Sequence, residues 1–211
     1  MICLSVGKAK VNECLEIIKG SEIAEIRLDL NIYTDEELEL IFSSHNNLIA
    51  TCREGKYNLD ERKLLLSKAI KFGAKYLDIE LVCEYTMRSF LVNLAKMSNC
   101  EVIISYHNYE KCPTRDHMKD IVKRCFDGHA DIAKIVCKVN SIDDNINILS
   151  LYELEKNILA FGMGKLGRIT RIAAPYLGAP FTYAFPKDMK RTAEGQFSVD
   201  KLQNIINLID D

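Results

Sequence analysis

The chain has 211 residues, of which 48% are hydrophobic and 27% are charged, and its formal net charge is −2. This length fits one compact domain over residues 1–211, and the composition is that of an ordinary soluble globular protein. The small net charge gives no basic surplus for a nucleic acid or a membrane surface. No apolar run approaches the roughly 18 residues of a membrane span, and the start lacks the pattern of a signal peptide.

Short apolar runs rich in β-branched residues alternate along the chain with longer amphipathic stretches. The runs predict strands at 2–6, 23–30, 48–53, 76–81, 101–107, 131–137, 158–163 and 181–185. The stretches between them predict helices at 11–19, 35–42, 60–72, 85–97, 115–126, 142–156 and 169–176, with a last helix at 199–209.

Strands that alternate with helices form βαβ units and a parallel sheet. Repeats of this kind along a chain of 211 residues favour an α/β fold of the TIM-barrel type, a (β/α)₈ barrel of one domain. An open doubly wound sheet is the alternative, but the GxGxxG turn that would favour it is missing after the first strand.

The eight cysteines lie scattered in apolar segments, and no two have the CxxC spacing of a zinc or redox site. Secreted proteins of small size use cysteines as a disulfide framework, whereas cytosolic proteins keep them reduced. We therefore expect reduced and mostly buried thiols in a cytoplasmic protein.

Lys134 lies in the middle of an apolar strand, where it shares one face with Ile132 and Val136. A charged lysine is costly to bury in such surroundings, so its position points to a function. The structural alternative is a lysine that extends from an edge strand to water.

The same alternation places polar side chains on the inner faces of five other strands, mostly near the carboxyl ends where barrel enzymes have their active sites. Taken singly, each has a structural explanation, such as a histidine satisfied in the core or an acid that balances charge. Together they favour an enzyme. The residues are Ser5, Glu25, Arg27, Asp29, Thr51, Arg53, Asp78, Glu80, Ser105 and His107.

This set of residues lacks a metal-ligand cluster, a Ser-His-Asp arrangement and a glycine-rich phosphate loop. A desolvated lysine near other cations can attack a ketone as the free amine, and a histidine such as His107 suits proton transfer near neutral pH. Arginines fit a carboxylate through paired hydrogen bonds. The residues therefore predict an imine-forming lyase that acts on a small, oxygen-rich, anionic ketone.

The motifs resemble the type I 3-dehydroquinate dehydratase family, in family order over nearly the whole chain. The matching segments are Glu25-Ile-Arg27-Leu-Asp29, Asp78-Ile-Glu80-Leu81, Val102-Ile-Ile-Ser105-Tyr-His107-Asn108, Ala130-Asp-Ile-Ala-Lys134-Ile135, Met163-Gly-Lys-Leu-Gly-Arg168-Ile-Thr-Arg171 and Thr192-Ala-Glu-Gly-Gln196.

The resemblance implies that Lys134 forms an imine with the C3 ketone of 3-dehydroquinate, without a metal or organic cofactor. His107 would then remove a C2 proton and help the C1 hydroxyl leave in a syn elimination that yields 3-dehydroshikimate. Arg171 would hold the substrate carboxylate, and Thr192 and Gln196 would close over it. Ser5, Glu25, Arg27 and Arg53 would contact the hydroxyls and the carbonyl side. A homodimer is also implied.

The chain departs from the family pattern in four places. Glu54 matches poorly to the glutamate expected after the arginine of the third strand, which leaves the group that orients His107 open; Asp78 and Glu80 are candidates. Thr192 stands where serine is common, and Glu194 stands where proline is usual, so we expect a less rigid loop. An N-terminal extension over the bottom of the barrel is also missing.

Two other functions remain as alternatives. A class I aldolase also forms an imine in a barrel, but a phosphate site after the last two strands would be expected, and residues 185–191 lack its glycine pattern. A non-catalytic barrel that binds a metabolite would be expected to lack Lys134 or His107, and both are present.

Overall fold

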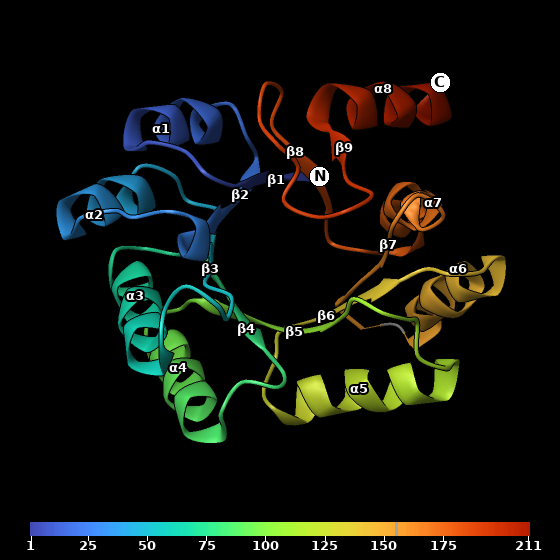
Figure 1. Ribbon diagram of the computed structural model, residues 1–211, viewed down its shortest axis with the longest axis horizontal. Coiled ribbons are helices and arrows are strands. Elements are labelled where there is room, and N and C mark those ends of the chain that lie inside the picture. The colour runs from blue at the N-terminus through green and yellow to red at the C-terminus, as the bar shows by residue number, and fades with distance from the viewer. Residues whose placement is uncertain (155) are drawn as a thin grey trace.

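The computed structural model describes residues 1–154 and 156–211. Its helices surround a curled parallel sheet (Figure 1). The strands are β1 (Ile2–Val6), β2 (Ile23–Arg27), β3 (Leu48–Thr51), β4 (Tyr76–Glu80), β5 (Glu101–Asn108), β6 (Ile132–Lys138), β7 (Ile158–Met163), β8 (Thr182–Phe185) and β9 (Phe197–Ser198). The helices are α1 (Val11–Lys19), α2 (Asp35–Ser43), α3 (Leu59–Lys71), α4 (Tyr85–Met97), α5 (Arg115–Asp127), α6 (Ile142–Leu149), α7 (Arg168–Ala173) and α8 (Val199–Asp210).

The sheet has the strand order β7-β6-β5-β4-β3-β2-β1-β8-β9, and every neighbouring pair is parallel. In the described part of the chain no ladder joins β7 to β8. Aromatic side chains meet between these strands instead. Phe161 of β7 packs edge to face on Tyr183 of β8, with ring centroids 5.9 Å apart, and Tyr183 packs on Phe181 at 5.5 Å. The predicted (β/α)₈ barrel is therefore confirmed. At the seam between β7 and β8, packed aromatic side chains take the place of a backbone ladder.

Two of the apolar clusters follow from the alternation of side chains along the strands. The larger lies between strands and helices and includes Ala133, Ile135 and Cys137 of β6. The smaller lies inside the barrel and includes Ile132 and Val136. The predicted inner and outer faces of β6 are therefore confirmed, and Lys134 shares the inner face.

Several helices begin at a capping box, in which a side chain at the N-cap and one three residues later satisfy free backbone N–H groups. Thr34 with Glu37 begins α2, and Asn58 with Glu61 begins α3. These caps fix the residue at which α2 and α3 each begin. None of the described helices is long and apolar enough to cross a membrane.

The predicted strand over residues 23–30 is wrong in its last three residues. β2 ends at Arg27, and Leu28–Leu30 form a 3₁₀ turn. The amide of Asn31 explains the change, because its Nδ2 donates to the carbonyls of Gly7 and Arg27, each at 2.8 Å, and its Oδ1 accepts from the N–H of Ala9 at 2.9 Å. These bonds turn the chain toward the loop after β1.

Two predicted helices end earlier than expected, and one strand was not predicted. The predicted helix over 142–156 stops at Leu149 and continues as a 3₁₀ turn, Ser150–Leu154, while residue 155 lies outside the described residues. The predicted helix over 169–176 likewise becomes a 3₁₀ turn at Ala174–Leu177. β9 is too short to be recognised from the sequence. As predicted, the eight cysteines are free thiols and most are buried.

Candidate active site

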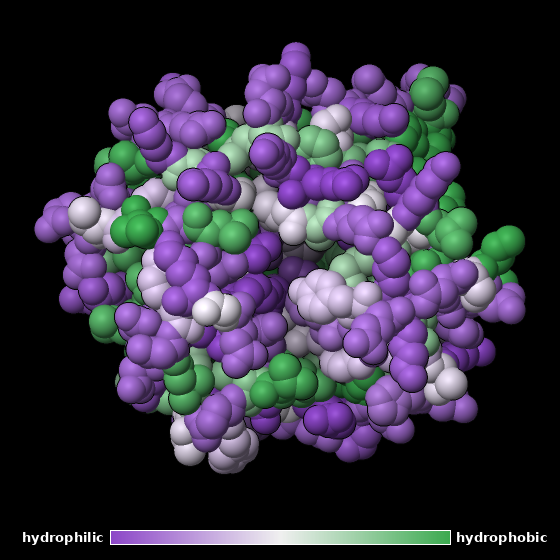
Figure 2. All heavy atoms as spheres, in the orientation of Figure 1, coloured by the Kyte–Doolittle hydropathy of each residue, from purple (hydrophilic) through white to green (hydrophobic). Residues whose placement is uncertain are grey.

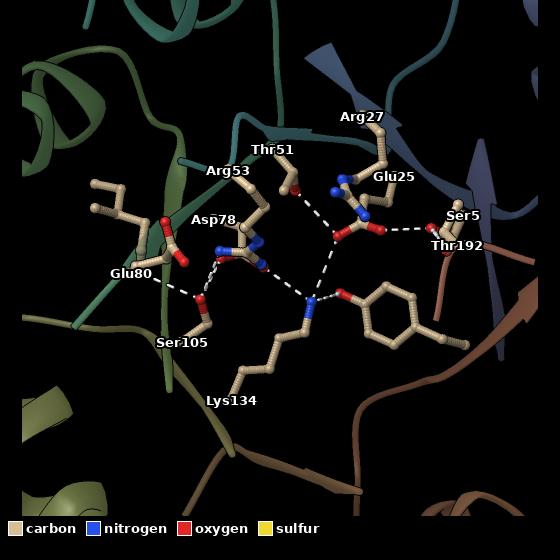
Figure 3. Close-up of polar contacts among 12 residues, drawn as sticks. Ser5, Glu25, Arg27, Thr51, Arg53, Asp78, Glu80, Ser105, Lys134 and Thr192 are labelled. Carbon is tan, nitrogen blue, oxygen red and sulfur yellow. Dashed lines mark hydrogen bonds and ion pairs between the residues drawn. The ribbon is translucent and has the colours of Figure 1, made fainter. Parts of the chain in front are cut away.

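Lys134 lies inside the barrel on β6 and is only 5% exposed. Its Nζ donates to Oδ2 of Asp78 at 2.9 Å, to the hydroxyl of Tyr183 at 3.1 Å and to Oε1 of Glu25 at 3.4 Å (Figure 3). An ammonium group has three hydrogens to donate, and these acceptors match that number. The direct charged partners of Lys134 are thus carboxylates, not the cations expected from the sequence.

Asp78 of β4 joins Lys134 to Arg53. Its Oδ2 accepts from Arg53 at 2.7 Å, and its Oδ1 accepts from the Ser105 hydroxyl at 2.6 Å. Burial raises the pKa of a carboxyl group, but here Arg53 and Lys134 outweigh burial and hold the pKa of Asp78 far below its ordinary value. Asp78 is therefore an ionised carboxylate between two cations.

Glu25 of β2 is the second buried carboxylate next to Lys134. Its Oε2 accepts from Ser5 at 2.6 Å, and its Oε1 accepts from Thr51 at 3.0 Å. Burial opposes its ionisation, but Lys134 and Arg27 lower the pKa of Glu25 below its ordinary value. Each oxygen therefore has a hydroxyl donor that keeps the carboxylate in place.

His107 lies near the end of β5, with its ring stacked on Tyr109 at 6.0 Å between centroids. Its Nδ1 is buried and has no hydrogen-bond partner among the described residues. Burial, together with the cations Arg53 and Lys134, holds the pKa of His107 well below its ordinary value. The imidazole is therefore neutral near pH 7 and can accept a proton.

Arg171 of α7 is 2% exposed, and its guanidinium carbon lies 5.5 Å from the centroid of the Phe161 ring. Within residues 1–154 and 156–211 it has no carboxylate partner, and its Nε has no acceptor. Burial lowers the pKa of Arg171 to about 10. A buried guanidinium without a counter-ion is well suited to bind the carboxylate of a ligand.

The segment 192–196 folds over the barrel opening and is held by Gln196, which is 4% exposed. Oε1 of Gln196 accepts from the backbone N–H groups of Thr192 and Ala193, at 3.0 and 3.1 Å, and from the Thr192 hydroxyl at 3.1 Å. Glu194 forms an ion pair with Lys138 at the end of β6. These contacts hold the segment at the cavity, which four of its five residues line.

Gly195 lets this segment touch the turn after β7. Its φ is +87°, and a Cβ atom on Gly195 would lie 2.6 Å from the carbonyl oxygen of Gly164. A larger residue at position 195 would strain the backbone and push the segment away from that turn. Glycine is therefore required at position 195 because of both the positive φ and the close approach to the Gly164 carbonyl.

These groups surround a cavity of about 270 Å³, visible as a hydrophilic hollow in Figure 2. Every site residue predicted from the sequence lines it except Ser5: His107, Lys134, Glu25, Arg27, Arg53, Arg171, Thr192 and Gln196. Ser5 is fully buried and is not among the lining residues, and its hydroxyl is 2.7 Å from that of Thr192. It links Glu25 to the covering segment.

The structure also places the residues whose roles the sequence left open. Glu80 pairs with Arg62 at 2.9 Å and does not line the cavity, and Glu54 is exposed outside it. Arg27, which lines it, is already bound to Asp29 by two hydrogen bonds, at 3.0 and 2.6 Å. Among the described residues, none of these acids bonds to His107.

Sequence reasoning missed Tyr183, which lines the cavity and contacts Lys134. The alternation along residues 181–185 places Phe181 and Tyr183 on one face, but it does not tell which face is inside. Lys138 was also missed, although it lies four residues after Lys134 on the same face.

The fold and the site define a barrel enzyme with a buried lysine that suits imine chemistry and a separate arginine that suits an anionic group. No group of three or more histidine, cysteine or acidic residues that could hold a metal ion occurs in the part of the chain that the structure describes.

The sequence profile of the type I 3-dehydroquinase family matches residues 2–211, so the chain belongs to this family. It is 34% identical to a 3-dehydroquinate dehydratase of Methanocaldococcus jannaschii, over 100% of this chain and 99% of the relative. It is 34% identical to that of Dehalococcoides mccartyi, over 97% and 93%. The crystal structure of the 3-dehydroquinate dehydratase from Aquifex aeolicus VF5 has a TM-score of 0.81 at 27% identity, over 97% of this chain and 96% of that one.

Proposed function

We propose that this chain, a lyase of the shikimate pathway, dehydrates 3-dehydroquinate to 3-dehydroshikimate and water through an imine on Lys134. Dehydration of 3-dehydroquinate is the activity of its family. One observation carries the residue assignment: the buried amine of Lys134 faces the same cavity as the guanidinium of Arg171, which is unpaired among the described residues. A ketone and a carboxylate on one small ring would meet both groups.

Arg171 binds the substrate carboxylate in this proposal. Arg27 and Arg53 line the same cavity but already have acidic partners, Asp29 and Asp78, so their guanidinium charges are compensated. Arg171 is the arginine of the cavity whose charge a substrate would neutralise. With the carboxylate of C1 fixed there, the C3 ketone, two ring atoms away, lies toward Lys134.

Lys134 attacks the C3 ketone, and the protonated imine draws electrons from C2, so that a C2 proton becomes acidic. His107 removes that proton because its imidazole is neutral. The resulting imidazolium lies near the C1 hydroxyl and returns the proton as that group leaves, which gives a syn elimination. Hydrolysis of the imine releases the product and restores the amine.

The covering segment completes the site. Thr192 and Gln196 close over the substrate, and the Ser5 hydroxyl contacts that of Thr192. Glu25, Arg27 and Arg53 provide the polar wall beside the ring hydroxyls. Exclusion of water strengthens each charged contact inside and protects the imine until dehydration is complete.

Borohydride trapping tests this mechanism. The protein is incubated with 3-dehydroquinate and sodium borohydride, and the modified peptide is mapped by mass spectrometry. We expect one adduct on Lys134, none in Lys134→Ala, and the same adduct on Lys134 in the matched control Lys138→Ala. We also expect His107→Ala to form the adduct while it releases little product. Normal turnover by Lys134→Ala would contradict the proposal.

We also propose a homodimer, which the family resemblance supports. Ile142 and Ile146 lie one turn apart on α6 and are 75% and 62% exposed. Nδ2 of Asn145 donates to the carbonyl oxygen of Leu166, and the side chain of Leu166 is also exposed. This apolar surface is a candidate for the contact between copies. Sedimentation of the wild type and of Ile146→Asp tests it, and a dimer in both would exclude this surface.

A cytoplasmic location is part of the proposal, supported by the free thiols. Fractionation of the source cells, followed by immunoblotting, checks it, and recovery outside the cytoplasm would contradict it.

A further inference from the structure

Tyr183 is the neutral group that contacts the Lys134 amine. Its hydroxyl oxygen lies 3.1 Å from Nζ, and the centroid of its ring lies 4.2 Å from the same atom. The ring is held edge to face by Phe161 and Phe181 at the seam between β7 and β8. The side chain is therefore fixed by packing, with its hydroxyl directed toward Nζ.

The phenol keeps its proton. Burial, followed by the negative charge of Glu25, raises the pKa of Tyr183 well above its ordinary value. The hydroxyl can therefore accept a hydrogen bond from Nζ with its oxygen and donate its own hydrogen to another acceptor. The hydrogen-bond partner found for this hydroxyl in the described residues is Lys134. A ligand in the cavity, which Tyr183 lines, would be the second partner.

The other partners of Lys134 lack this ability. Asp78 and Glu25 are ionised, so they accept hydrogen bonds but have no hydrogen to give. Their oxygens are already bonded to Ser105 and Arg53, or to Ser5 and Thr51. Of the three groups bonded to Nζ, Tyr183 alone can donate to a substrate oxygen.

We propose that Tyr183 is a further catalytic residue, which transfers protons between Nζ of Lys134 and the ketone oxygen of the substrate during formation and hydrolysis of the imine. This inference rests on the proposed function and adds a proton path to its first and last steps. His107 keeps the separate task of moving the C2 proton.

The transfer balances without another reactant. As the nitrogen–carbon bond forms, one proton passes from the Lys134 ammonium to the hydroxyl of Tyr183, while the proton of that hydroxyl passes to the ketone oxygen. A second transfer of the same kind makes this oxygen a leaving water, and the carbon–oxygen bond breaks. The protonated imine keeps one hydrogen and the single positive charge, and Tyr183 ends unchanged. Hydrolysis follows the same path in reverse.

The test is the rate of imine formation in Tyr183→Phe, which keeps the ring and removes only the hydroxyl. Enzyme and 3-dehydroquinate are mixed, quenched with borohydride after set times, and analysed by intact mass. We expect adduct formation to slow by about 100-fold, the usual size of an acid–base contribution. The matched control is Tyr76→Phe at the start of β4, in which the same atom is removed at the other end of the barrel. It should react at the wild-type rate.

The possible results separate this inference from the proposed function. Adduct formation by Tyr183→Phe at the wild-type rate overturns the role of Tyr183 and leaves the imine mechanism intact. No adduct in the wild type overturns both. Proton transfer also predicts that imine formation in the wild type is slower in D₂O, and this measurement needs no variant. An equal rate in D₂O overturns the proton path.

Discussion

Nζ of Lys134 and Oδ2 of Asp78 lie 2.9 Å apart inside the barrel, and Asp78 is only 1% exposed. The same oxygen accepts from Arg53 at 2.7 Å. One buried carboxylate therefore balances two cations, the buried Lys134 of β6 and the partly buried Arg53, two residues after β3. A pair of this kind is costly to break, because removal of one partner leaves an uncompensated charge in the interior.

Substitution Asp78→Asn should destabilise the protein. It keeps the shape of the side chain but removes the charge that Lys134 and Arg53 share. We expect the free energy of unfolding, measured by urea denaturation, to fall by about 3 kcal/mol. Asp35→Asn is the control, because its ion pair with Lys68 is solvent-exposed and should change stability by less than about 0.5 kcal/mol. Equal effects of the two substitutions would contradict the role of Asp78.

Stability should decrease in acid. The pKa values of Asp78 and Glu25 are lower in the folded protein than their ordinary values of about 4. Below about pH 5 the unfolded chain therefore binds more protons than the folded chain, and stability is lost as the pH falls. Each such group adds at most about 1.4 kcal/mol per pH unit. Urea denaturation from pH 7 to pH 3 measures the slope, which should be shallower in Asp78→Asn. A free energy of unfolding that stays constant from pH 7 to pH 3 would contradict the lowered pKa values of Asp78 and Glu25.

The pH dependence of turnover should reflect His107. Because burial and nearby cations lower its pKa in the folded protein, its imidazole stays neutral below the ordinary value of about 6.5. We expect kcat/KM to remain level through pH 6.5 and to decline only at lower pH, as His107 takes up a proton. A pH–rate profile checks this with buffers of constant ionic strength. An acid limb centred at or above pH 6.5 would exclude the neutral base.

Arg171→Met should weaken substrate binding while it makes the folded protein more stable. The guanidinium is buried and has no counter-ion in residues 1–154 and 156–211, so its replacement by an apolar side chain of similar length should raise the free energy of unfolding by about 1 kcal/mol. The same change removes the proposed carboxylate partner and should raise KM about 100-fold. The control is Arg115→Met, whose partner Glu153 lies on the surface. An unchanged KM in Arg171→Met would require another binding group.

Gly195→Ala should impair the covering segment while the barrel stays folded. The positive φ and the 2.6 Å approach to the Gly164 carbonyl leave no room for a Cβ atom. We expect kcat/KM to fall at least 10-fold, with a thermal midpoint within a few degrees of the wild type. At Gly20, by contrast, a Cβ atom meets nothing within 4 Å, so Gly20→Ala should keep full activity. Equal activity of both variants would show that the segment does not need this conformation.

Much of this molecule can be read from local sequence. The apolar runs predict β1 and β7 to the residue, and amphipathic spacing does the same for α1 and α4. The period of two along β6 is enough to place Lys134 inside, because one face of a barrel strand must meet apolar helices. The residues that meet in the cavity were also predictable, since the carboxyl ends of parallel strands open on the same end of a barrel.

Other features depend on partners that are distant in the chain. Asn31 ends β2 through bonds to Gly7 and Ala9, and nothing in residues 23–30 reveals them. Ser5, predicted as a substrate contact, is not among the residues that line the cavity, and its hydroxyl contacts Glu25 and Thr192. The sequence led to the expectation of other cations beside Lys134, whereas the groups bonded to its Nζ are two carboxylates and a phenol.

The sequence by itself determined the fold class, the family and the inner position of Lys134 and His107, because periodicity and motif order are local properties of the chain. The tertiary structure decided which charges are compensated. Arg27 and Arg53 have acidic partners, Arg171 has none among the described residues, and Tyr183 reaches Lys134 from a strand 49 residues away. Charge balance and proton paths depend on distances of about 3 Å between segments remote in sequence, and only the folded barrel sets those distances.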